Sequence, residues 1–274
     1  MAVLRSTLLA LGLALSGASA EAHDFWIRPA SFAPRSGERV ALDLCVGADL
    51  AGDRLPRSEA KLLRFFALDP KGEAQDVLGL DGRAPAGWLR PGAEGTWWVG
   101  YESRATAIEL EAAKFESYLV EEGLESVSAE RRRRGQGALA GREQYSRSVK
   151  SLLVCGTGAA REFGRELGLP LELLLRSDPA ALARGSELEF ELHFQGRALA
   201  GALVGLQHEG APEPPRRRTD EHGRVRFALR EPGVHLARVV HMLPAEPGSG
   251  ADWRSYWSSL SFAYSPASSP SGAK

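Results

Sequence analysis

The residue whose position suggests chemistry most clearly is His23, which stands where an export signal ends and a mature chain would begin. Upstream, a basic residue precedes an apolar run over residues 8–15 that is too short to remain in a bilayer as a span. Overlapping small-x-small motifs predict cleavage after Ala20 or after Ala22. We therefore interpret residues 1–22 as a signal peptide and expect a periplasmic protein.

Either cleavage product could bind a transition metal through His23. A free α-amine has a pKa of about 8, so a metal ion can displace its proton near neutral pH. With His23 first, its amine and imidazole can chelate Cu²⁺. With His23 third, the amine, two backbone amides and the imidazole can form a square-planar site for Cu²⁺ or Ni²⁺. The alternative is that His23 is only the first polar residue before a strand.

Three other residues could support such a site. His235 and His241 have the same parity in one predicted strand and lie about 20 Å apart, so at most one of them can join His23. We favour His241, which is followed by the thioether of Met242. Asp24 and Asp252 could bind metal or orient an imidazole. The predicted metal-site residues are therefore His23, Asp24, His241 and Asp252.

The other histidines and acids give weaker signals. His193 alternates outward on its strand and is expected to face solvent, and His222 lies in a turn. The adjacent carboxylates Glu121 and Glu122 diverge by about 100° on a helix and cannot form an acid–base pair. The sequence contains no recognisable nucleophile elbow, P-loop or zincin motif, so we expect a binding protein and not an enzyme.

These residues must be positioned by a mainly β chain. Short period-two runs between turns predict two β-sandwich domains of immunoglobulin or transthyretin type, separated by a helical insertion. We expect a first domain over residues 23–155 with helices within about 109–134, a linker over 156–169 and a second sandwich over 170–264. Residues 265–274 are rich in Ser, Pro, Gly and Ala and should be disordered.

Composition excludes several classes of partner. A formal net charge of −1 argues against broad binding to nucleic acid. No run after the signal is long enough for a membrane-spanning helix. Cys45 and Cys155 each end an apolar run in an exported chain, so they could form a disulfide or remain two buried thiols, and both alternatives are open.

Taken together, several motifs resemble a bacterial family of domains of unknown function that is often described as a periplasmic component of cobalt or nickel uptake. The resemblance covers nearly the whole mature chain. Residues 201–240 separately resemble a transthyretin-like or carboxypeptidase-regulatory sandwich. The motifs that carry the family resemblance include 23–27 (HDFWI), 101–103 (YES), 114–124 (KFESYLVEEGL), 145–147 (YSR), 168–172 (GLPLE), 219–224 (TDEHGR), 240–242 (VHM) and 251–253 (ADW).

The family resemblance implies a periplasmic β-rich protein linked to Ni²⁺ or Co²⁺. Together with the chemistry of His23, it favours a protein that handles Ni²⁺, Co²⁺ or Cu²⁺, with an inner-membrane metal transporter as its partner. A different function class is a carbohydrate-binding or adhesion sandwich that uses exposed aromatic rings at Trp88, Trp97 or Trp253. A third is a copper oxygenase, which requires a second histidine facing His23.

Overall fold

The computed structural model describes residues 24–48, 50–157, 162–211 and 214–266, and it is mainly β with a helical insertion, as the sequence predicts. His23 lies outside the described residues. Within these ranges, no helix is both long and apolar enough to cross a membrane. Both cysteines are described, and both are buried free thiols.

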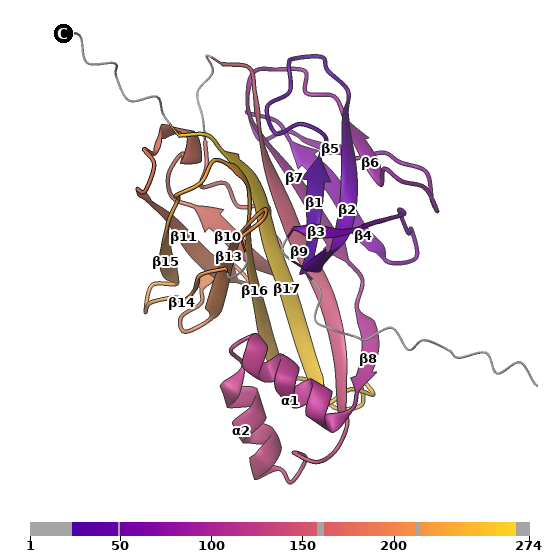
Figure 1. Cartoon of the computed structure of the whole chain (residues 1–274). Coiled ribbons are helices and arrows are strands. Elements are labelled where there is room, and N and C mark those ends of the chain that lie inside the picture. The colour runs from indigo at the N-terminus through magenta and orange to yellow at the C-terminus, as the bar shows by residue number, and fades with distance from the viewer. Residues whose placement is uncertain (1–23, 49, 158–161, 212–213, 267–274) are drawn as a thin grey trace, which may run out of the picture.

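A nine-stranded sheet extends through the whole molecule (Figure 1). Its parallel pair, β9 and β17, joins strands from the two halves of the chain. The predicted domain limits remain a prediction. The two halves of the chain contribute strands to this one sheet, and backbone hydrogen bonds between β9 and β17 connect them. Its strands in spatial order are β14 (Arg216–Arg218), β13 (Leu203–His208), β16 (Gly233–Pro244), β17 (Trp253–Tyr264), β9 (Gly141–Cys155), β7 (Gly95–Ser103), β4 (Leu62–Leu68) and β5 (Ala74–Asp76), and β8 (Thr106–Leu110) also pairs with β9.

Two smaller sheets cover opposite faces of the large sheet. Adjacent tryptophans on β7 show this, because Trp97 packs in the core beneath one small sheet and Trp98 in the core beneath the other. Successive side chains of a strand point to opposite faces. The first small sheet contains β1 (Asp24–Pro29), β2 (Val40–Ala48), β3 (Ala51–Leu55) and β6 (Gly87–Leu89), and the second contains β10 (Leu171–Leu175), β11 (Glu187–Phe194), β12 (Arg197–Ala198) and β15 (Arg224–Ala228).

Strand β1 is fixed against the large sheet by serines. It pairs with β2 along one edge only, so carbonyls on its other edge need donors from elsewhere. The hydroxyls of Ser259 and Ser261 on β17 donate to the carbonyls of Phe25 and Ile27, at 2.7 and 2.6 Å. Small side chains on β17 thus let β1 lie close to the sheet and hold this strand in place.

The helical insertion closes one end of the long strands β9, β16 and β17 (Figure 1). It consists of α1 (Ala112–Glu121) and α2 (Glu125–Arg133), separated by Gly123 at a φ of 68°. Outside the insertion, a short 3₁₀ helix covers Pro179–Ala181. The apolar face of α1 packs on Val240, Met242 and Trp253 of the large sheet.

A close contact between α1 and β9 gives a test of this packing. A Cβ added at Gly141 would lie 2.3 Å from the Phe115 ring, which is fully buried. Gly141→Ala should therefore lower the free energy of unfolding by about 1–3 kcal/mol through overpacking. Gly137→Ala is the matched control, because its Cβ would meet nothing nearer than 3.5 Å. Equal stability of the two variants in chemical denaturation would contradict this packing.

Candidate functional site

Asp24, which follows His23, is the first residue of β1 and is buried. Its carboxylate lies 3.0 Å from Nε of Arg238 on β16 and accepts a hydrogen bond from Nε2 of Gln207 on β13. Arg238 also donates from Nη1 to both carboxylate oxygens of Glu122, at 2.8 Å each. We call Asp24, Glu122, Gln207 and Arg238 the Arg238 cluster. It joins β1, the end of α1 and the large sheet.

The Arg238 cluster carries more negative than positive charge. Two carboxylates share one guanidinium, which leaves one excess negative charge when both are ionised. Burial raises the pKa of Asp24 to about 6, although Arg238 opposes this change. Burial likewise raises the pKa of Glu122 against the same guanidinium. A further cation beside these two groups would be electrostatically favourable.

Two buried polar atoms of the cluster form no hydrogen bond among the described residues, but one of them, Nε of Arg238, still has the carboxylate of Asp24 beside it. Oε1 of Gln207 is buried and, among the residues that the structure describes, receives no hydrogen bond, while the side chain as a whole is only 4 % exposed. A buried acceptor without a donor costs about 1–3 kcal/mol. The cluster therefore combines excess negative charge with a hydrogen-bond acceptor that has no donor. One of its members, Asp24, directly follows His23 in the sequence.

His241 does not lie near this cluster. It is on β16, but its parity is opposite to that of Arg238, and its ring contacts Phe194 of β11 with centroids 4.6 Å apart. Burial lowers its pKa. His241 and Asp24 thus lie on opposite faces of the large sheet. The adjacent Met242, whose thioether was one reason to favour His241, is on the opposite face from His241, in the core beneath the helices.

Asp252 is engaged in a structural ion pair. Its two carboxylate oxygens accept hydrogen bonds from Nη2 and Nε of Arg142, at 2.7 and 3.0 Å. These hydrogen bonds hold the pKa of Asp252 below its usual value. The structure therefore does not bring Asp24, His241 and Asp252 together. In the described ranges, no three His, Cys, Asp or Glu side chains form a group that could hold a metal ion.

The aromatic residues proposed for a carbohydrate surface are mostly internal. Trp97 and Trp253 are buried in two different cores, so the expectation that they are exposed was wrong. Trp88 is 36 % exposed, and the guanidinium of Arg39 lies 3.8 Å from its ring centroid. One partly exposed tryptophan does not make the aromatic platform that this alternative needs.

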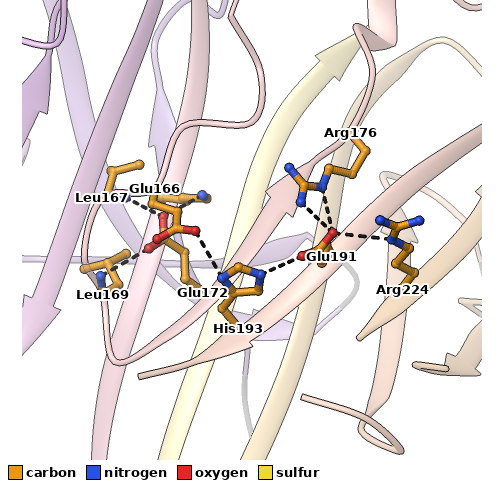
Figure 2. Close-up of polar contacts among 9 residues, drawn as sticks. Glu166, Leu167, Leu169, Glu172, Arg176, Glu191, His193 and Arg224 are labelled. Carbon is orange, nitrogen blue, oxygen red and sulfur yellow. Dashed lines mark hydrogen bonds and ion pairs between the residues drawn. The ribbon is translucent and has the colours of Figure 1, made fainter. Parts of the chain in front are cut away.

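The expectation that His193 faces solvent was also wrong. Figure 2 shows its imidazole between two carboxylates, with Nε2 2.7 Å from Glu191 and Nδ1 3.2 Å from Glu166. Glu191 also receives hydrogen bonds from Nε and Nη2 of Arg176, at 2.8 and 2.6 Å. Arg224 approaches the same carboxylate at 3.4 Å. The alternation of β11 correctly places Glu191 and His193 on one face, but it does not indicate that other segments cover that face.

A second buried pair lies beside this network. Lys150 of β9 donates to Glu172 of β10 at 2.8 Å, and both side chains are almost fully buried. Glu172 also accepts from the backbone amides of Leu167 and Leu169 (Figure 2). This carboxylate therefore fixes the segment that crosses between the two halves of the chain. Its contacts are complete, which indicates a structural role.

The network around Glu191 should make folding sensitive to acid. Burial alone would raise the pKa of Glu191, but hydrogen bonds from His193 and Arg176 outweigh it and lower the pKa from 4.5 to about 2. A lowered pKa stabilises the fold above about pH 4.5, and this stabilisation is lost as the pH falls towards 2. Glu191→Gln should lower the free energy of unfolding at pH 7 by about 1–3 kcal/mol and remove this pH dependence.

Denaturant titration between pH 7 and pH 2 measures both effects. Glu189→Gln is the control, because the ion pair of Glu189 with Arg226 lies on the same face but is more exposed. We expect a much smaller change for this control. Identical pH dependence in wild type and Glu191→Gln would show that the network contributes nothing to stability.

Comparisons with known proteins identify the family and leave the function open. No curated protein matches the chain. Among solved structures, a DUF4785 family protein from Legionella pneumophila is similar at a TM-score of 0.23 and 11 % identity, over 77 % of this chain and 50 % of that one, so the chain spans half the length of that protein. The D0–D1 domain of intimin is similar at a TM-score of 0.21 and 11 % identity. This similarity covers 88 % of this chain and 98 % of that one. Both similarities are too distant to support an argument.

The family profile named Domain of unknown function (DUF4198) matches residues 20–243, which include β1, the helical insertion and most of β16. The match covers the residues of the Arg238 cluster and extends to His241. The chain belongs to this family.

Proposed function

We propose that the protein is an exported, periplasmic transition-metal-binding protein in which His23 is the principal ligand. The observation that carries the proposal is the Arg238 cluster, which fixes Asp24 and presents excess negative charge at the start of β1. A divalent cation held by the adjacent residue would be attracted to this charge. The free acceptor of Gln207 lies in the same cluster.

The ligand set that we propose is smaller than the one predicted from sequence. Asp24 is held by Arg238 and Gln207, Asp252 is held by Arg142, and His241 faces the other side of the sheet. These residues do not fit a shared site. We therefore assign the chelate to the α-amine and imidazole of His23 after cleavage behind Ala22, with Asp24 as the anchor of the chain. Such a nitrogen pair favours Cu²⁺ and also accepts Ni²⁺ or Co²⁺.

Metal handling in the periplasm, with an inner-membrane metal transporter as the partner that receives the ion, follows from this proposal. The function is binding and not catalysis. The copper-oxygenase alternative requires a second imidazole facing His23, and its predicted partner His241 contacts Phe194 on the opposite face. The carbohydrate-binding alternative needs exposed rings, but two of its three tryptophans, Trp97 and Trp253, are buried.

Calorimetric titration of the exported, untagged protein with Cu²⁺ and Ni²⁺ tests the proposal. Intact-mass measurement should first give a chain that begins at His23. His23→Ala should weaken the tightest Cu²⁺ binding by about a hundredfold or more, equivalent to about 2.7 kcal/mol, because both chelating nitrogens belong to this residue or depend on its position. His222→Ala is the control, since His222 is exposed in a turn.

A second variant that retains one extra residue before His23 separates the amine from the imidazole. It should also bind Cu²⁺ more weakly than the native terminus. Unchanged affinity in His23→Ala, or no binding tighter than about 10 μM in the native protein, would contradict the proposed function.

A further inference from the structure

Two histidines outside the proposed N-terminal site lie directly opposite each other on neighbouring strands. His208 ends β13 and His235 lies near the start of β16, and the two residues are register partners. Their ring centroids are 4.8 Å apart. His235 is buried and stacks on Phe262 at 5.5 Å, on the face of the large sheet opposite Arg238.

Backbone carbonyls fix the tautomer of both rings. Nε2 of His208 lies 3.0 Å from the carbonyl oxygen of Pro232, and Nδ1 of His235 lies 3.3 Å from that of Gly233. A carbonyl oxygen can only accept, so each of these nitrogens carries the hydrogen. Nδ1 of His208 and Nε2 of His235 are therefore the nitrogens with free lone pairs. Histidines that bind metals commonly donate their other N–H to a carbonyl in this way.

Burial, and then the neighbouring His208, lower the pKa of His235 to about 4, so this ring is neutral at physiological pH. Neutral imidazole is the form that binds metal ions. The separation of the two rings also fits a shared ion. With metal–nitrogen bonds of about 2.0–2.1 Å and an angle of about 90–110°, two imidazole centroids lie about 4.5–5.3 Å apart.

Both imidazoles line a cavity of about 360 Å³ whose other walls are mainly apolar, including Leu206 and Phe227. The acid of this cavity, Glu231, is already bound at both carboxylate oxygens by Arg184. Two arginines also line the cavity, Arg217, which lies 3.7 Å from Glu187, and Arg230. The two imidazoles therefore supply the nitrogen donors that an ion in the cavity could use. The room beside them leaves positions for water or a small ligand.

We propose that His208 and His235 together bind one transition-metal ion of the Cu²⁺ class, as an open two-nitrogen site facing this cavity. The site is separate from His23 in sequence. Among the described residues, it lies on the face of the large sheet opposite Asp24 and Arg238. It does not depend on the proposed function. Two protein ligands imply weaker and more exchangeable binding than a closed site of four ligands.

The test uses Cu²⁺ alone and a His23→Ala background, so that failure of this site and failure of the His23 site are distinguishable. This variant should bind one Cu²⁺ saturably, and electron paramagnetic resonance should show coupling to two imidazole nitrogens. His208→Gln in the same background should weaken binding by about ten- to a hundredfold. His222→Gln is the matched control and should leave the affinity and spectrum unchanged.

A variant that keeps both imidazoles gives a second test, although alanine at Gly233 also strains the backbone, whose φ there is 131°. A Cβ at Gly233 would lie 3.0 Å from Nε2 of His208, so Gly233→Ala should displace this ring and weaken Cu²⁺ binding. Circular dichroism and thermal unfolding establish that each variant is folded. Absence of saturable binding in His23→Ala, or binding unaffected by His208→Gln in folded protein, would overturn the proposal.

Discussion

The guanidinium of Arg238 determines how β1 meets the rest of the molecule. It contacts Asp24 at the start of β1 and Glu122 at the end of α1, and it projects from the middle of β16. These three elements are far apart in sequence. Removal of one member of such a buried ion group typically costs about 3–5 kcal/mol, because the remaining charge has lost its partner. The position of Asp24 at the start of β1 depends on this contact.

The large sheet supplies the second constraint. Both of its faces are buried around β7 and β9, so Trp97 and Trp98 serve different cores. Strands that are covered on both sides have continuous apolar runs in place of alternation. The same geometry separates two chemistries. Arg238 and the start of β1 occupy one face, while His208, His235 and His241 occupy the other.

Much of the fold could be predicted from local patterns. Strict alternation identifies β11, and the glycine after an amphipathic run marks the end of α1 at Gly123. The environment of His193 could not be predicted, because its carboxylate partner Glu166 comes from a segment whose position depends on tertiary packing. The aromatic residues show the same limit. Periodicity does not indicate that Trp97 is buried.

The candidate site was predicted only in part. Asp24 was predicted as a supporting metal-site residue, and the structure shows it buried in the Arg238 cluster with a raised pKa. The role of Glu122 was missed because it was considered only with Glu121, whereas its partner lies on β16. The pairing of His208 with His235 requires the register of β13 against β16, which depends on long-range contacts. Parity within β16 could be read from the sequence, but the face on which β1 packs could not.

The position of a bound ion tests the central claim most directly. Crystals of the exported, untagged protein would be soaked with Cu²⁺, and anomalous diffraction would be recorded at the copper edge. We expect an anomalous peak for a copper ion at the start of β1. This ion would be bound by the amine and imidazole of His23 and would lie close to Asp24 and the guanidinium of Arg238. An ordered His23 without copper, or copper found only at other places, would contradict it.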